Sequence, residues 1–372
     1  MGYDAVTLVL FPWHLAYFNI FAGGPDGGYR YLVDSNLDWG QTWKALADYL
    51  NAEGISEFYM SSYTINDPRA YGLDYTPLPP WPDAPPVLPQ RFNPSPGVYA
   101  ISTTQLQGVV VADPEMYDCF RHLEPVARIG HAMFVYELGA TVPVSWVAQC
   151  TVPVAPLPSE TLREGLGIGE DIPLLAFDCE QSWVIPPGSG RYVVVRGVPT
   201  FPWGIWSDLR LAYEQKRTGF VPPFAVYEWD NPSTPPTPPI TAVPSLAVGE
   251  SLTFLGYGRA SLQAGERGTM ETWWRIEARP KSPLSLMAHL VDRDGTLVAV
   301  GDGLGLAGEH WLPGSILIQR HALEIPIDAA PGSYALQIGA YTLSNLEQLP
   351  VAAGESQIGD HAVVGSLEIV AP

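Results

Sequence analysis

Residues 17–41 read YFNIFAGGPDGGYRYLVDSNLDWGQ and combine a glycine cluster, a short apolar run and an acidic turn. The glycines of residues 23–28 predict a loop, because glycine adopts positive φ without a Cβ clash. The alternation over Tyr29–Val33 predicts a strand. A helix is expected from about Asp38 to Leu50, ended by Gly54. Strand, polar loop and helix in this order predict the opening of a βαβ unit and therefore an α/β domain.

Four polar residues after the expected strand form a candidate polar site: Asp34, Asn36, Asp38 and Gln41. The carboxyl end of such a strand is where α/β folds bind ligands. Two interpretations stay open, a helix cap with a fixed turn or a site for a sugar or metal. A calcium loop is rejected, since its sixth position needs glycine and its twelfth needs glutamate. The glycine cluster also lacks the Lys-Ser/Thr of a phosphate loop.

Two segments resemble one protein family. The first is the stretch of residues 17–41, with its words YFN, AGG and YLVDSNLDWGQ, and the second is LEPVARIGHAMFVYEL at residues 123–138. Together they resemble the region after the last membrane helix of bacterial polyprenyl-phosphate-sugar-dependent glycosyltransferases, the protein-mannosyltransferase-like class. The resemblance covers about residues 12–138. It implies that the catalytic acid belongs to membrane helices outside this chain, so no catalytic residue is assigned here.

The composition limits the classes of partner. The 372 residues hold 19 Lys+Arg against 39 Asp+Glu, a formal net charge of −20. Such an acidic chain is not expected to bind nucleic acid or to dock on anionic lipid through a basic patch. Its 38 prolines, 36 glycines and 12 tryptophans predict many turns and β-rich structure with aromatic surfaces. No cofactor is expected.

The chain has three cysteines, Cys119, Cys150 and Cys179. An odd number leaves at least one thiol outside any intramolecular pairing. Either a Cys150–Cys179 bridge in an oxidising compartment or buried free thiols fits the sequence. No pair has metal-ligand spacing with a nearby histidine, so no metal site is expected. No histidine lies between His131 and His289 to activate Cys179 as a nucleophile, so a structural role is favoured.

The sequence predicts five regions. They are a juxtamembrane-like apolar segment (1–27), an α/β domain (28–140), a small α/β lobe (141–223), a proline-rich linker (224–243) and an all-β sandwich of immunoglobulin or fibronectin type (244–372). Within the first region, residues 5–22 are interrupted by Pro12, His14 and Asn19 and are too short for a confident membrane span. They are expected either to touch the membrane surface through their aromatic residues or to pack on the first domain.

The sandwich is predicted from short alternating runs separated by turns, such as residues 268–276, 284–291 and 333–341. It suggests a second candidate site, because exposed aromatic rings can stack on sugars. The candidate glycan-stacking residues are Trp273, Trp274, Trp311 and Tyr341, with Asp292, Asp302 and His310 as hydrogen-bonding groups. Strand alternation buries one of Trp273 and Trp274. Core and edge packing of all these rings is the competing interpretation.

Three functional hypotheses follow. The first is the soluble extracytoplasmic accessory portion of a lipid-linked-sugar glycosyltransferase, peripheral or tethered at the membrane. It would contact a polyprenyl-phosphate-sugar or a glycan acceptor and would not be catalytic alone. The second is a stand-alone glycan-binding or cell-surface interaction protein. The third is a hydrolase with Asp34 and Asp38 as an acid/base pair, which no spacing in the sequence singles out.

Overall fold

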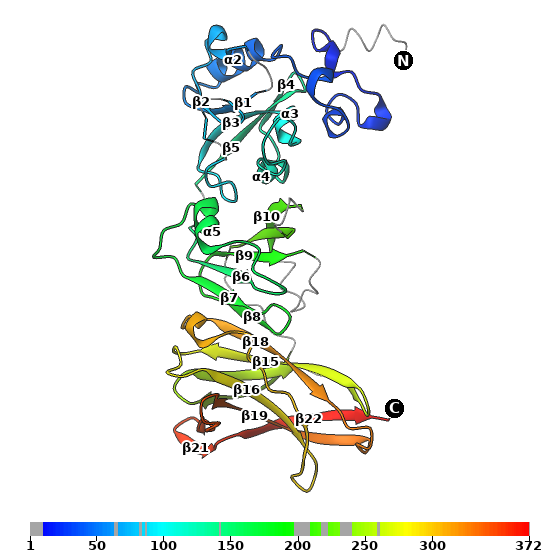
Figure 1. Cartoon of the computed structure of the whole chain (residues 1–372), viewed down its shortest axis with the longest axis vertical. Coiled ribbons are helices and arrows are strands. Elements are labelled where there is room, and N and C mark those ends of the chain that lie inside the picture. Colours follow the sequence, from blue (N-terminus) through cyan, green and yellow to red (C-terminus); the bar gives the residue numbers. More distant parts are fainter. Residues whose placement is uncertain are drawn as a thin grey trace. The chain divides into compact units, whose positions relative to one another are not determined.

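The computed structural model describes residues 10–62, 66–81, 84–85, 88–140, 143–196, 209–216, 222–230, 240–258 and 261–371. The chain divides into two compact units. The first comprises residues up to 142, 157–170 and 211–226, and the second comprises 143–156, 171–210 and 227–372. The chain is mainly β-structure arranged in several sheets, as Figure 1 shows.

The first unit is built on one five-stranded mixed sheet of order β2-β1-β3-β5-β4. Its strands are β1 (Tyr59–Ser61), β2 (Thr76–Pro77), β3 (Gly97–Ser102), β4 (Ala127–Ile129) and β5 (Met133–Leu138). β1 pairs in parallel with β2 and β3, whereas β5 pairs antiparallel with β3 and β4. The unit also contains α2 (Trp43–Ala52), α3 (Thr103–Leu106), α4 (Asp118–Arg121) and α5 (Ser159–Leu166). Because this sheet contains both parallel and antiparallel pairs, the α/β class expected for this region stays a prediction.

Helix α2 packs on this sheet as its apolar spacing predicts (Figure 1). Trp43, Leu46, Ala47 and Leu50 are buried and form one core with Met60, Ala100 and Val135. Residues four apart lie on one helix face, so a single stripe meets the strands. Gly54, at φ 70°, follows the last turn, which confirms the expected end of the helix.

The strand predicted at Tyr29–Val33 is wrong. The segment before α2 consists of 3₁₀ turns: η1 (His14–Ala16), η2 (Ile20–Ala22), η3 (Gly28–Arg30) and η4 (Asp34–Asn36). Their backbone groups pair locally, since Gly28 N donates to Gly24 O at 3.0 Å and Leu32 N to Gly28 O at 3.1 Å. A Cβ on Gly28 would lie 1.9 Å from the Phe18 ring, so glycine permits this close approach. A further turn, η5, spans Pro68–Tyr71.

The second unit contains a β-sandwich. One sheet has seven strands in the order β21-β20-β12-β13-β15-β18-β8, and the other has five in the order β14-β22-β19-β16-β17. Their bounds are β8 (Ser182–Ile185), β12 (Ile240–Val248), β13 (Leu252–Gly258), β14 (Ser261–Gln263), β15 (Arg267–Ile276), β16 (Leu284–Val291), β17 (Leu297–Val300), β18 (Ile316–Glu324), β19 (Gly332–Thr342), β20 (Val351–Ala353), β21 (Ser356–Gly359) and β22 (Ala362–Val370), with the turn η7 at Gly308–His310.

Part of the segment predicted as a separate lobe at 141–223 shares its core with this sandwich, whereas residues 157–170 and 211–223 belong to the first unit. In the second unit β6 (Trp146–Cys150) pairs in parallel with β7 (Leu174–Phe177) and β9 (Gly190–Val195). β8 joins the seven-stranded sheet by pairing antiparallel with Ile316–Gln319 of β18. All four residues of β8 are buried, so the strand needs neighbours on both faces. The division therefore differs from the expected boundaries.

Part of the region expected to be a linker, residues 224–243, forms strands. Residues 224–229 form strand β11 (Phe224–Trp229), and Ile240 begins β12, while 231–239 lie outside the described residues. The division between the units falls within β10 (Arg210–Gln215), after Arg210, and within β11, after Val226. Across the described parts of the chain, no helix is both long and apolar enough to cross a membrane.

Candidate functional site

Of the four residues of the candidate polar site, Asn36 and Gln41 bond within their own turn, whereas Asp34 and Asp38 also bond to residues beyond it. Gln41 accepts from Trp39 N at 2.7 Å and donates to Leu37 O at 2.8 Å. Asn36 donates to Val33 O at 3.5 Å. Asp34 has positive φ (63°), and its backbone N–H donates to the hydroxyl of Thr104 at 3.0 Å. These bonds fix the chain between η4 and α2.

Asp38 is the most deeply placed of the four and is fully buried. Its Oδ1 accepts from Gly40 N at 2.9 Å, and its Oδ2 accepts from the hydroxyl of Ser102 at the end of β3. Burial raises the pKa of Asp38, while the bonds from Ser102 and Gly40 lower it in part. The carboxyl of Asp38 is therefore buried in a turn cap and is not exposed for the acid/base role considered with Asp34.

The tryptophans named for glycan stacking are buried, so they offer no open ring face. Trp273, Trp274 and Trp311 are at most 3% exposed. Trp274 packs edge to face on Phe254 at 4.8 Å between ring centroids and donates to the hydroxyl of Thr272. Trp311 donates to Leu306 O. Alternation was expected to bury one of Trp273 and Trp274, and both are buried, although Thr269 and Arg275 are exposed on the face of β15 that carries Trp273.

Tyr341, the fourth candidate aromatic residue, lies in β19 of the sandwich and is hydrogen-bonded to other polar side chains. Its hydroxyl donates to Asp302 Oδ2 at 2.9 Å, and Asp302 Oδ1 lies 3.0 Å from His289 Nε2. These contacts lower the pKa of Asp302 against the opposing effect of its burial. Both carboxylate oxygens of Asp302, which was expected to hydrogen-bond a glycan, are therefore bonded to side chains of the protein itself.

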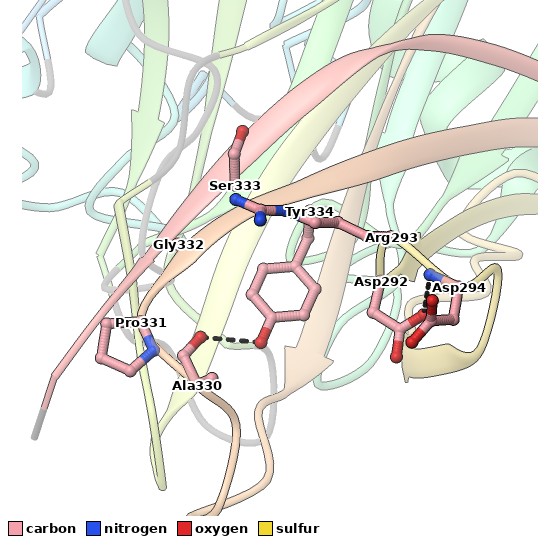
Figure 2. A pocket seen from close by; sticks show the side chains of 8 residues that line it. All are labelled: Asp292, Arg293, Asp294, Ala330, Pro331, Gly332, Ser333 and Tyr334. Carbon is pink, nitrogen blue, oxygen red and sulfur yellow. Dashed lines mark hydrogen bonds between the residues drawn. The ribbon is translucent and has the colours of Figure 1, made fainter.

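Asp292 belongs to a cavity of about 340 Å³ at one end of the sandwich, lined by residues 292–294 and 330–334 (Figure 2). Asp292 Oδ1 accepts from Asp294 N at 2.9 Å and from Thr296 N at 2.8 Å, and Tyr334 donates to Ala330 O. The carboxylate therefore holds the hairpin turn between β16 and β17. Because Asp292 is hydrogen-bonded within the turn and the cavity offers no open aromatic ring, few of its lining groups could bind a sugar.

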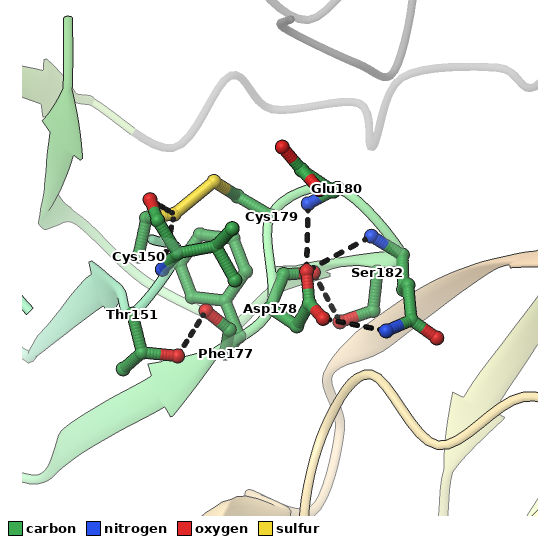
Figure 3. The surroundings of a disulfide bond; sticks show 9 residues. Cys150, Thr151, Phe177, Asp178, Cys179, Glu180 and Ser182 are labelled. Carbon is green, nitrogen blue, oxygen red and sulfur yellow. Dashed lines mark hydrogen bonds between the residues drawn. A yellow bond between two sulfur atoms is a disulfide. The ribbon is translucent and has the colours of Figure 1, made fainter. Parts of the chain in front are cut away.

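Cys150 and Cys179 form the disulfide that the sequence left open, and Cys119 is a buried free thiol. The bridge joins the ends of the neighbouring parallel strands β6 and β7 (Figure 3). Beyond it, Asp178 Oδ1 accepts from Glu180 N and Gln181 N, which builds the polar turn into β8. The polar residues Asp178, Glu180 and Gln181 therefore have a structural role in this turn. Burial also raises the pKa of Cys119, which makes it a poor nucleophile.

The two segments that carry the family resemblance lie against each other in the first unit. His131 Nδ1 is 2.7 Å from Asp26 Oδ1, and the rings of Tyr29 and Phe134 meet edge to face at 4.9 Å. A small core of Ala16, Leu37 and Ala132 lies beneath them. The fold thus unites segments more than 80 residues apart in the sequence.

A cavity of about 170 Å³ opens where these segments meet. Tyr29 and Arg30 come from the first segment, and the second supplies Leu123, Glu124, Pro125, Arg128, Phe134 and Tyr136. The remaining lining residues are Leu106, Gln107, Phe120 and Arg121. We call this cavity the arginine pocket, after Arg30, Arg121 and Arg128. It is the candidate site that both resembling segments build.

Sequence reasoning did not single out these arginines. The available signal was that Arg30 and Arg128 lie inside the two resembling segments and Arg121 lies just before the second, in a chain with few cations. Only the pairing of β4 with β5 and the turn at η3 bring them to one cavity.

Comparison with known proteins leaves the family open. No family model matches the chain, and no curated protein matches it. Among solved structures, a family 123 glycoside hydrolase from Clostridium perfringens is 12% identical over 34% of this chain and 27% of its own, with a TM-score of 0.19. The CARDB domain of a Pyrococcus furiosus protein, solved with di-metal ions, is 10% identical over 36% of this chain and 98% of its own, with a TM-score of 0.20.

A β-glucuronidase of glycoside hydrolase family 2 is 14% identical over 39% of this chain, with a TM-score of 0.17. This chain spans only 13% of that enzyme. Likenesses at this level carry no functional argument, and none of the three concerns a membrane glycosyltransferase.

Proposed function

We propose that this chain is the extracytoplasmic accessory portion of a lipid-linked-sugar glycosyltransferase, not catalytic alone, that docks on the membrane surface. The observation that carries the proposal is the joining of residues 17–41 and 123–138 around the arginine pocket. These are the segments that resemble the membrane glycosyltransferases. Their meeting at one cavity gives the resemblance a physical site where a lipid-linked sugar or a glycan acceptor would bind.

An exposed apolar surface supports membrane docking. Ile20 and Phe21 in η2 are 84% and 93% exposed, and Phe11, Leu15, Tyr31 and Leu32 are exposed nearby in the sequence. Asn19 caps η2 by accepting from Ala22 N, so this turn is formed without burying its apolar side chains. We call residues 11–32 the docking segment. Exposed aromatic and aliphatic residues suit the interface of a bilayer, and the acidic chain favours neutral lipid.

The same segment is anchored to the first unit. Ala16 is buried, and Trp13 lies against Gly130, where an added Cβ would approach its ring to 2.8 Å. Both expectations for residues 5–22 therefore have support in the described part, residues 10–22, since one face packs and other side chains are exposed. The disulfide supports the extracytoplasmic location, because such bridges persist mainly in oxidising compartments.

Co-sedimentation with neutral phosphatidylcholine vesicles tests docking. The full chain should sediment with vesicles, and Ile20→Asp with Phe21→Asp should reduce the bound fraction at least fivefold. Ile327→Asp is the matched control, since Ile327 is 72% exposed in the second unit. Equal sedimentation of the double variant and the control, or none by the unaltered chain, would refute docking. Sugar transfer from a lipid-linked donor by the purified chain would refute the accessory role.

The hypothesis of a stand-alone glycan-binding protein relied on the sandwich tryptophans. With all three buried, no described feature of the sandwich favours it over the accessory role.

A further inference from the structure

We propose that the arginine pocket binds the phosphate group of a phosphate ester, with Arg30 and Arg128 as its ligands. This site adds a ligand class to the proposed function. It rests on the proposed function only where the ester is taken to be lipid-linked. The residues that carry it all lie in the first unit.

The charge at this pocket is opposite to that of the chain. Acidic residues outnumber Lys+Arg by 39 to 19 overall, yet three arginines and one carboxylate, Glu124, line this cavity. The guanidinium group is planar and binds phosphate oxygens through two parallel N–H donors. A cluster of such groups within an acidic protein is typical of a site for an anion.

The three arginines differ in how far their donors are used. Arg121 is fixed, with Nε donating to Leu106 O, Nη1 to Glu115 and Asp118, and Nη2 to Pro114 O. These two carboxylates offset its charge. Arg121 therefore forms the wall of the pocket and supplies little attraction for an anion.

Arg30 and Arg128 retain donors for a ligand. Arg30 pairs with none of the described carboxylates and lies over the ring of Tyr29 at 5.5 Å. Arg128 lies over the ring of Phe134 at 5.1 Å. Its ion pair with Glu124 is 3.4 Å long, and the Glu124 side chain is 93% exposed. Exposed pairs of this kind contribute little, so a phosphate can replace Glu124 at small cost.

The contact between Tyr29 and Phe134 also holds the two guanidinium groups in place. Each arginine lies over one ring of that pair, and the two rings touch. Stacking of this kind restricts a long side chain before the ligand arrives, which reduces the entropy lost on binding.

The size of the cavity indicates how much of a ligand enters it. Its volume of about 170 Å³ lies below the roughly 300–1,000 Å³ of pockets that enclose drug-sized molecules. It therefore suits a small charged group, with the remainder of the ester outside. Tyr136 and Phe120 are buried and form an apolar part of the cavity wall.

Isothermal titration calorimetry of the full chain at low salt tests the site, using inorganic phosphate, glucose 1-phosphate and farnesyl phosphate as probes. Both esters should bind, and their affinity should fall as salt rises. Arg30→Gln with Arg128→Gln should weaken ester binding at least tenfold. Arg267→Gln, whose arginine pairs with Glu324 at an exposed site, is the matched control and should bind as the unaltered chain does.

The probes separate the sources of the phosphate. Tighter binding of farnesyl phosphate than of glucose 1-phosphate supports a lipid-linked ester, and the reverse order supports a free sugar phosphate. Equal binding of glucose or glucuronate would overturn the phosphate assignment, and so would full affinity in the double variant. Unchanged circular dichroism and melting temperature show that the variant is folded. Because docking is measured separately with the Ile20 and Phe21 variants, failure at this pocket is distinguishable from failure of the proposed function.

Discussion

His131 Nδ1 lies 2.7 Å from Asp26 Oδ1, a contact between residues 105 positions apart in the chain. It joins the glycine-rich loop to the turn between β4 and β5. The neighbouring Tyr29–Phe134 contact does the same for the walls of the arginine pocket. The candidate site therefore depends on tertiary contacts between the segment of 3₁₀ turns before α2 and the β4–β5 hairpin.

The Tyr29–Phe134 contact should appear as a measurable coupling. In a double-mutant cycle of Tyr29→Ala and Phe134→Ala, urea unfolding should give an interaction free energy of about 0.5–1.5 kcal/mol. Tyr29→Ala combined with Ile318→Val, a core change in the second unit, should be additive. Additivity in the first cycle would mean that the two rings do not stabilise the meeting of the segments.

The buried ion pair between Arg191 and Glu228 should matter for the stability of the second unit. Arg191 is 1% exposed, and its Nη2 lies 2.8 Å from Glu228 Oε1. Burial lowers the pKa of Arg191 to about 10. Glu228 also pairs with Arg210, so Glu228→Gln removes the ion-pair partner of the buried Arg191 and of Arg210 and should cost about 3–5 kcal/mol in urea unfolding. Glu250→Gln, at an exposed pair with Lys281, should have little effect, and equal losses would contradict this explanation.

His321 should make the sandwich sensitive to acid. Its ring is buried, Nε2 lies 2.6 Å from the hydroxyl of Thr272, and Nδ1 contacts Gly301 O. Burial lowers the pKa of His321 to about 4 from 6.5. The unfolded chain therefore binds the proton first, and the stability conferred by the neutral ring is lost as the pH falls from about 6.5 to about 4.

Urea unfolding at pH 7, 5.5 and 4 measures this loss. The chain should lose stability over this range, and His321→Gln should lose less because it removes one titrating group. The nearby Asp302 and His289 remain in both proteins, so the difference between the two profiles reports His321 together with its coupling to these two groups. Parallel profiles would show that protonation of His321 is not coupled to unfolding.

The disulfide should stabilise the second unit. Cys150 and Cys179 are separated by 29 residues, and closing such a loop restricts the unfolded chain. Cys150→Ser with Cys179→Ser should cost about 2–4 kcal/mol. Thiol titration in denaturant should find one thiol before reduction and three after it, since the chain has three cysteines. Three thiols before reduction would exclude the bridge.

Much of the fold could be predicted because local pattern and tertiary packing agree. The helical spacing of Trp43, Leu46 and Leu50 matches α2, and the strand predicted at 284–291 is β16. The apolar run Tyr29–Val33 misled because glycines on its N-terminal side allow tight turns whose hydrogen bonds close locally. The tryptophans misled because alternation predicts which residues share a face, and Trp273 is buried on a face of β15 where Thr269 and Arg275 are exposed.

The sequence by itself determined the β-rich character of this protein, its acidic charge, helix α2 and the main strands of the sandwich, because each depends on residues close together in the chain. Only the tertiary structure decided which side chains share a site. It buried Asp38 and the tryptophans in the interior, attached β8 to the sandwich and brought Arg30 to Arg128. These outcomes depend on contacts between distant residues, whose choice of partners follows from packing and burial rather than from local pattern.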